Sequence, residues 1–206
     1  GKNNKWGFFT GMSTGWVMSE EKFMDNVKPI MNNFKWRLSY GQTGNCSIGL
    51  YDAEGGYSPT QKYNGLAGIR PTVMQNLDLK WETTTQFDAG FDVGFLNNRI
   101  NLMFDYFNKD TKDLLYNQPL PNTSGFGSVM MNVGKVRFYG FDVELKTNNI
   151  TTKDFDWSST VTVSFIKNKV LKLQENGRDR NRQGGINLPD GTSFGGIAEG
   201  EPLYRY

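Results

Sequence analysis

The clearest pattern in the sequence is a long, strict alternation of apolar and polar residues. In KWETTTQFDAGFDVGF, residues 80–95, aromatic and small apolar side chains alternate with acidic, amide and glycine positions. A period of two predicts a β-strand, because successive side chains of a strand point to opposite faces. This strand has about 15 residues, whereas roughly 5–6 are usual. After Asn97-Asn98 the alternation resumes in INLMFDY, residues 100–106.

Other segments alternate in the same way. They are NFKWRLSY (33–40), YGFDVELK (139–146), FDWSSTVTVSF (155–165) and, more weakly, WGFFTGMSTGWVM (6–18). In the five clear strands the apolar positions carry no Asp, Glu, Lys or Arg, whereas the opposite positions carry many. A β-sandwich would bury such an apolar face as its core. A transmembrane β-barrel would turn it toward lipid.

Connection lengths favour the barrel. Asn97-Asn98 predicts a two-residue hairpin turn, because Asn tolerates the positive φ of such turns, and the link 147–154 is also short. Long connections near 45–79, 108–136 and 167–200 alternate with these. An up-and-down meander then collects the long connections at one end, as in outer-membrane barrels. In the link 19–33, Ser19 predicts a helix N-cap and Pro29 limits the helix to about two turns.

The two faces predict different environments. We expect the tryptophans of the apolar face to lie at the two membrane interfaces, as aromatic girdles do; they are Trp6, Trp16, Trp36, Trp81 and Trp157. We expect the charged residues of the opposite face to line a wet interior, where they pair with each other or form a polar path; they are Arg37, Asp88, Asp92, Asp105, Asp142, Glu144 and Lys146. The expected fold is all-β, an antiparallel up-and-down meander forming part of a large transmembrane barrel.

The strand count predicts an incomplete barrel. Six strands are recognisable, with a seventh possible from Glu201 onward, whereas the smallest membrane barrels have about eight. Unpaired strand edges are too costly in lipid. The first residues lack the apolar segment of a secretory signal. We therefore expect the 206 residues to be an arc of a longer chain.

Composition removes several function classes. No run of 18 apolar residues exists, which predicts no transmembrane helix. The net charge is +2 and the basic residues are scattered, which argues against nucleic acid as a partner. Histidine is absent and Cys46 is the only cysteine. Because His is the commonest general base and the commonest metal ligand, we predict no catalysis, no metal and no cofactor.

Four segments, taken in order, resemble a known family. They are WRLSYGQTGN (36–45), NLDLKWETTTQFDAGFDVGFLNNRINLMFDYFNKDTKDLL (76–115), NVGKVRFYGFDVEL (132–145) and IKNKVLKL (166–173). The order is that of SusC/RagA-type TonB-linked outer-membrane proteins of Bacteroidetes. The sequence departs from the family pattern at Phe138-Tyr139 and at Asp142, and neither change disturbs the alternation.

The resemblance implies a fold and a role. The family has a 22-stranded outer-membrane barrel with an N-terminal plug, and this chain would be a piece of its C-terminal half without the plug. Family members import glycans or peptides with energy from TonB, and a SusD-like surface lipoprotein closes the outer mouth. The expected partners are therefore that lipoprotein, TonB through the absent plug, an oligosaccharide or peptide, and outer-membrane lipid.

Aromatic residues in the long connections are candidates for ligand contact, because aromatic faces stack on sugar rings. They are Tyr51, Tyr57, Tyr63, Tyr116 and Phe126. They would serve equally to pack the loops on each other or on a lipoprotein. The rival to the transporter hypothesis is a secreted, soluble β-sandwich that holds carbohydrate with these tyrosines.

Overall fold

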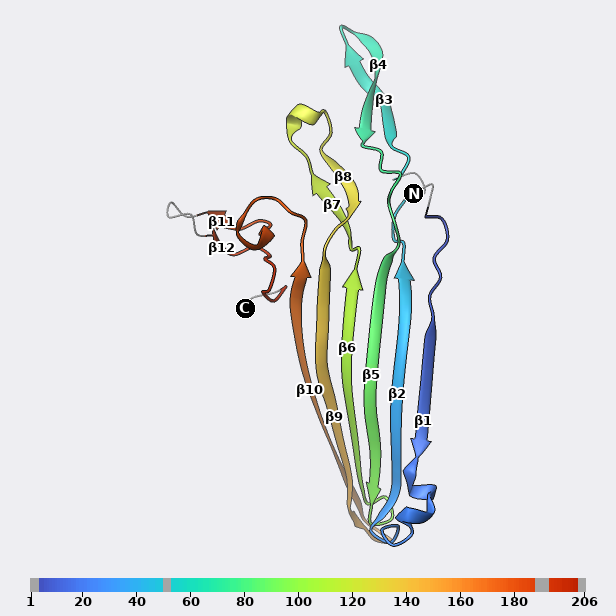
Figure 1. The fold of residues 1–206 in the computed structure, drawn as a ribbon. Coiled ribbons are helices and arrows are strands. Elements are labelled where there is room, and N and C mark those ends of the chain that lie inside the picture. The colour runs from blue at the N-terminus through green and yellow to red at the C-terminus, as the bar shows by residue number, and fades with distance from the viewer. Residues whose placement is uncertain (1–3, 50–52, 188–192, 204–206) are drawn as a thin grey trace.

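A single antiparallel sheet of six strands dominates the computed structural model, which describes residues 4–49, 53–187 and 193–203 (Figure 1). Its strands are β1 (Gly11–Val17), β2 (Met31–Asn45), β5 (Glu82–Phe95), β6 (Ile100–Lys112), β9 (Lys135–Thr151) and β10 (Asp156–Lys172). Their spatial order, β1-β2-β5-β6-β9-β10, follows the order along the chain. The predicted all-β antiparallel meander is therefore confirmed.

The long connections contain small hairpins of their own, which the alternation did not predict. These are β3 (Gly56–Tyr63) with β4 (Leu66–Val73), β7 (Leu115–Pro119) with β8 (Ser128–Asn132), and β11 (Ile186–Asn187) with β12 (Ser193–Phe194). Single 3-10 turns, η3 (Asn122–Ser124) and η4 (Asp179–Asn181), accompany the last two. The first two hairpins project beyond the same end of the sheet, whereas β11 and β12 lie beside the end of β10 (Figure 1).

The sequence did carry a signal for the β3–β4 hairpin. Asn64 and Gly65, which join the two strands, both have positive φ, 50° and 81°. Asn-Gly is the strongest short-range mark of a two-residue hairpin turn, because both central residues must adopt positive φ. The flanking residues alternate poorly, which is why the turn signal alone locates this hairpin.

The opposite end of the sheet carries the short connections. Asn97 and Asn98 have φ of 57° and 60°, as their sequence predicted. The prediction of a two-residue turn is wrong, because Phe95 and Ile100 are the last paired residues and leave a four-residue turn between them. Leu96 also has positive φ, 53°. The chain thus needs an additional left-handed residue to reverse between β5 and β6.

The predicted helix between β1 and β2 is also wrong. The segment forms two 3-10 turns, η1 (Met18–Glu20) and η2 (Lys22–Met24), and the buried Ser19 side chain caps neither of them. The indole N–H of Trp16 donates to the Glu21 carboxylate over 3.1 Å, which fixes the first turn to the end of β1. Pro29 lacks the N–H that a longer helix would need.

The chain after β10 returns to that strand. The N–H of Val170 donates to the carbonyl of Glu201, and the N–H of Gly200 donates to the carbonyl of Val170, both over 2.8 Å. The Glu199 carboxylate accepts the N–H of Leu173 over 2.8 Å and the amide of Asn181 over 3.0 Å. These hydrogen bonds lower the pKa of Glu199 below its ordinary value. We call residues 173–187 and 193–201 the clasp.

The apolar residues of the sheet do not form an ordinary core. The fully buried apolar side chains include Leu79, Val170 and Ala198, which lie at the ends of the sheet or in the clasp. The large side chains of the strands remain exposed, with Trp36 at 39% and Phe165 at 46%. Within the described residues no helix is long and apolar enough to cross a membrane.

Candidate functional site: a sheet with two faces

One face of the sheet carries a continuous row of aromatic rings, and we call it the aromatic face. Neighbouring rings have centroids 5.3–6.1 Å apart, at distances typical of favourable aromatic pairs. The row crosses β2, β5, β6, β9 and β10 through Trp36, Phe91, Phe104, Phe141 and Phe165. The three phenylalanine pairs are stacked, with interplanar angles of 20–24°. The row links neighbouring strands, although its rings remain partly exposed.

The dimensions of the aromatic face match a bilayer. From Phe87 to Phe95 the strand rises about 27 Å, close to the ~25 Å apolar band of outer-membrane barrels. Trp16 lies directly opposite Trp36 at the end with the short connections, and Trp157 lies near the start of β10. These three predicted interface tryptophans therefore gather at one end of the sheet.

The other two tryptophans lie outside the strands. Trp6 precedes β1 and is 93% exposed. Trp81 precedes β5, and its ring meets that of Phe9 edge-on with centroids 5.9 Å apart. Their place at a membrane interface stays a prediction.

The opposite face, which we call the polar face, is organised by an arginine that spans three strands. Arg37 of β2 lies opposite Gly90 of β5, which lies opposite Asp105 of β6. Its guanidinium donates to both carboxylate oxygens of Asp92, over 2.9 and 3.0 Å, and forms a 3.0 Å ion pair with Asp105. Bidentate pairs of this kind are the strongest and most directional ion pairs.

The arginine crosses β5 at a glycine for a steric reason. A Cβ at Gly90 would be 2.7 Å from the Phe104 carbonyl oxygen and would overlap the Asp105 carboxylate. Any larger residue would displace the Asp105 side chain that Arg37 reaches. Gly90 therefore provides the space that the Arg37–Asp105 pair occupies.

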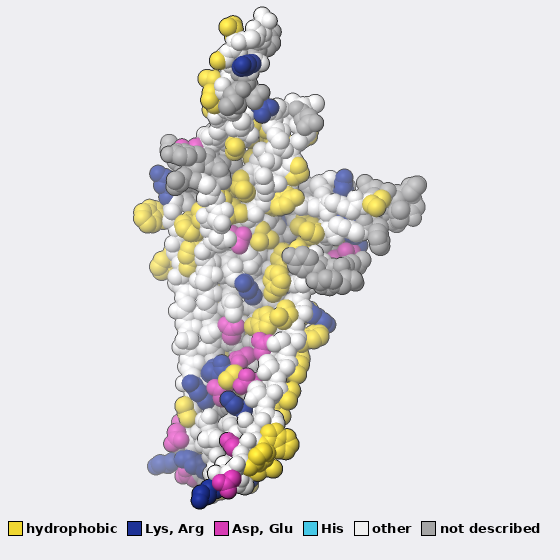
Figure 2. Space-filling model, turned by 180° about the vertical axis from the view of Figure 1, so that it is seen from behind, with side chains coloured by type: hydrophobic (Ala, Val, Ile, Leu, Met, Phe, Trp, Pro, Cys, Tyr) yellow, Lys and Arg dark blue, Asp and Glu magenta, His cyan; other side chains and the backbone are white. Residues whose placement is uncertain are grey.

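All seven predicted interior residues lie on the polar face, but they form separate groups. Asp88 accepts hydrogen bonds from Ser39 and Gln86, each over 2.8 Å. The positions of the remaining three follow from the register, which sets Asp142 opposite Asp105, Glu144 opposite Met103, and Lys146 opposite Asn101. Figure 2 looks onto this face, where acidic and basic side chains gather over the part of the sheet nearer the short connections. No group of three or more His, Cys, Asp or Glu in the described ranges is arranged to hold a metal ion.

The predicted ligand-contact aromatics lie near the projecting hairpins. Tyr57 is on β3 and is 75% exposed, and Tyr116 is on β7 and is 40% exposed. Phe126 lies between η3 and β8. Tyr51 and the side chain of Tyr63 lie outside the described residues. The described aromatics therefore come from two hairpins at the same end of the sheet (Figure 1).

A single sheet with one aromatic and one polar face is what a segment of barrel wall requires. A family model described as "TonB dependent receptor-like, beta-barrel" matches residues 4–199. The chain belongs to this family of β-barrel proteins. The resemblance to SusC/RagA-type proteins is thereby confirmed, and the sheet is a segment of a β-barrel in the bacterial outer membrane.

Relatives support the same assignment. TonB-dependent receptor P3 of Formosa agariphila is 40% identical over 177 residues, which cover 84% of this chain and 18% of that protein. TonB-dependent receptor SusC of Bacteroides thetaiotaomicron is 33% identical over 180 residues, with the same coverage of 84% and 18%. The chain thus spans less than a fifth of the length of these relatives.

Solved structures match the fold as well. The RagAB peptide importer in its "closed-closed" state matches with a TM-score of 0.79 and 26% identity, over 97% of this chain and 21% of that one. The RagAB peptide transporter matches with a TM-score of 0.76 and 27% identity, over 84% and 19%. The rival prediction of a soluble sandwich is therefore set aside.

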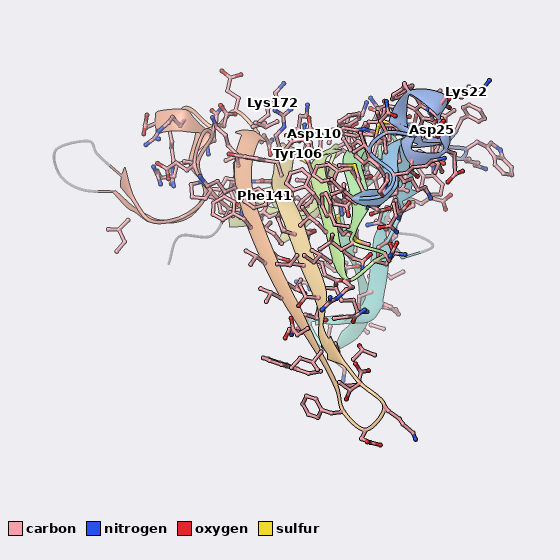
Figure 3. All side chains as sticks on the ribbon, turned by 90° about the horizontal axis from the view of Figure 1, so that it is seen from below. Lys22, Asp25, Tyr106, Asp110, Phe141 and Lys172 are labelled. Carbon is pink, nitrogen blue, oxygen red and sulfur yellow. The ribbon has the colours of Figure 1, made fainter. Side chains whose placement is uncertain are left out.

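One group on this barrel segment was missed by the sequence analysis. Beyond Tyr106 and Phe141 the aromatic face becomes charged, and Asp110 pairs with Lys135 over 2.8 Å and with Arg137 over 2.6 Å (Figure 3). The strands are longer than predicted and carry the alternation past the apolar band. Asn108, Asp110 and Lys112 continue the parity of Phe104 and Tyr106, which was the available signal.

Proposed function

We propose that the protein containing this chain is a TonB-dependent outer-membrane importer of oligosaccharides or peptides. The six-stranded sheet is an arc of its barrel wall. In this proposal the aromatic face meets lipid and the polar face meets the barrel interior. The supporting observation is the separation of the aromatic row from the Arg37 ion pairs on a single sheet, in a chain of this family.

The polar face is suited to a hydrated pathway rather than to chemistry. Three of its carboxylates accept hydrogen bonds from Arg37, Ser39 or Gln86 in a regular sheet; they are those of Asp88, Asp92 and Asp105. A charged wall of this kind orients polar solutes or holds the side chains of a plug. Both substrate classes carry hydroxyl or amide groups that such a wall can hydrogen-bond, and the RagAB relatives are named as peptide importers.

The partners belong to the proposal as well. We propose that a SusD-like surface lipoprotein covers the end from which the β3–β4 and β7–β8 hairpins project. TonB would act through a plug region outside these residues. The exposed rings of Tyr57 and Tyr116 would contact the substrate or the lipoprotein at that end.

Uptake by intact cells tests the function. The gene for the whole protein is deleted, and entry of labelled oligosaccharides and labelled peptides is measured with and without the plasmid-borne gene. The proposal expects loss of uptake for one class, restored by the gene, and abolished when TonB is removed. Unchanged uptake of both classes would contradict it.

The β3–β4 hairpin offers a sharper test of the partner. Replacing residues 56–73 with a short Gly-Ser turn removes the hairpin and leaves the six barrel strands intact. We expect the tagged variant to reach the outer membrane while losing most of its co-purifying lipoprotein. The same replacement of residues 115–132 provides a matched comparison, and full retention of the lipoprotein by both variants would contradict the proposed contact.

A further inference from the structure

A row of cations borders the aromatic face at the end with the long connections. We call it the cationic border, and it consists of Lys112, Lys135, Arg137, Lys167, Lys169 and Lys172. The register sets Lys135 of β9 directly between Lys112 of β6 and Lys172 of β10. In the adjacent row Arg137 lies between Asp110 and Lys169. Figure 3 labels Asp110 and Lys172, which frame this region.

The cationic border has more positive charge than its neighbours neutralise. Among the ion pairs of the described residues, Asp110 serves both Lys135 and Arg137. Glu199 of the clasp lies close enough to Lys172 to interact with it electrostatically. Two carboxylates thus face six cations. Like charges directly opposite each other on neighbouring strands destabilise a sheet, so this arrangement favours an anionic ligand.

The cationic border adjoins the apolar band without a gap. A groove of about 360 Å³ lies between them, with Tyr40 and Phe87 on its apolar side and Lys112 and Lys135 on its charged side. On β10 the Lys167 ammonium lies 5.1 Å from the centre of the Phe165 ring. A ligand in this groove would therefore meet apolar and cationic groups together.

The position of the cationic border identifies the source of the anion. Lys167 lies opposite Tyr139 at the edge of the band that spans the hydrocarbon, and Lys135 lies about 13 Å farther along β9. A side chain on this face of a barrel points out toward the membrane, not into the interior. The groups found at that depth are lipid headgroups. A soluble polyanion would have to displace lipid to reach the same groove.

We propose that the cationic border binds the phosphate groups of lipids in the leaflet at the long-connection end. The acyl chains of those lipids would lie on the aromatic row, and their phosphates would bridge Lys112, Lys135 and Lys172. The ligand class is a phosphorylated membrane lipid. This inference rests on the outer-membrane location and not on what the protein imports.

Lipid retention by the whole protein tests the proposal. The wild type and the variant K112Q/K169Q/K172Q are reconstituted in phosphatidylcholine nanodiscs that contain diphosphorylated lipid A. They are then extracted in mild detergent and examined by native mass spectrometry. Because each lysine near an anionic surface contributes several-fold to binding, we expect retention of lipid A to fall at least about tenfold in the variant.

Two control variants and two ligand controls make the outcome specific. The variant K22Q/K28Q/K153Q removes the same charge at the opposite end of the sheet and should retain lipid A. The variant K112R/K169R/K172R keeps the charge and should retain it too, which separates ligand loss from misfolding. Equal retention of dephosphorylated lipid A, equal loss in K22Q/K28Q/K153Q, or release of lipid A by millimolar inorganic phosphate would each overturn the proposal.

Discussion

The aromatic face and the polar face are built on the same strands yet are stabilised in different ways. On the aromatic face the rings meet in pairs across neighbouring strands, as Phe91 meets Phe104 on one side and Trp36 on the other. On the polar face one side chain, Arg37, joins carboxylates on two other strands. The first arrangement is a sum of similar pair contacts, and the second depends on one group and on the space above Gly90.

The two faces tolerate different substitutions. In the proposed orientation the aromatic face meets lipid, so a ring lost from the aromatic row removes contacts worth about 0.5–1.5 kcal/mol per pair, and lipid can fill the space. A charge placed there has no water to solvate it. The polar face accepts new charges because it already carries both signs, but a new side chain at Gly90 displaces an existing pair. A charged substitution is therefore the test of the aromatic face, and a larger side chain at Gly90 is the test of the polar face.

The largest contrast is expected between adjacent residues of β6. Phe104→Arg places a charge in the middle of the aromatic row and should cost about 2–4 kcal/mol, the value for a cation at the bilayer midplane. Met103→Arg places the same charge on the polar face, opposite Asp92 and Glu144, and should cost less than about 1 kcal/mol. Urea unfolding of the whole protein in vesicles, followed by tryptophan fluorescence, measures both.

Equal costs for the two arginine variants would show that the two faces do not differ in environment. Phe104→Leu is the size control, because it keeps an apolar side chain and removes only the stacked ring. We expect it to cost about 1 kcal/mol, between the two arginine variants.

The next contrast concerns space on the polar face. Gly90→Val suits a strand but overlaps the Asp105 carboxylate, so we expect a loss of about 1–3 kcal/mol, as for other overpacked sites. Arg37→Gln should cost about 1 kcal/mol, because the pair is partly exposed and screened by water. If Gly90 acts by leaving room for Arg37, the double variant should cost less than the sum of the two. Strict additivity would contradict that role.

The sequence predicted the meander and the two faces because both follow from a period of two. For the same reason the sequence predicted which charged residues share the polar face. It could not predict that Arg37 reaches over Gly90, because that contact depends on which residues of β2, β5 and β6 lie in one row. Register between strands separated by long connections is set by the whole sheet, and the sequence of a single strand does not contain it.

The ends of the strands were also predicted poorly from the sequence. For this reason the sequence analysis missed the cationic border. The alternation predicts strands that end where the apolar residues end, near Tyr106 and Tyr139. The strands continue to Lys112 and begin at Lys135, because the backbone ladder continues after the side chains change from apolar to charged. A period of two with polar residues on both faces carries little hydrophobic signal, so the pattern faded before the strands did.

The smallest expected effect lies outside both faces, in the clasp beside β10. Hydrogen bonds from Leu173 and Asn181 stabilise the ionised Glu199 carboxylate and lower its pKa in the folded protein. A group with a lowered folded pKa stabilises the fold above its unfolded pKa, of about 4.3, and loses this contribution as the pH falls through the folded value. We therefore expect the clasp to loosen below about pH 4, while the sheet remains intact.

Amide exchange at Leu173 measures this directly, because its N–H donates to Glu199. Exchange, corrected for its intrinsic pH dependence, should accelerate on acidification in the wild type. In Glu199→Gln the neutral amide oxygen still accepts the hydrogen bond, so protection should be weaker at neutral pH and should not change on acidification. The amides of Phe104 and Phe141, paired inside the sheet, should remain protected throughout. If Leu173 kept its protection at low pH in the wild type, the ionised Glu199 carboxylate would not be what joins the two ends of the clasp.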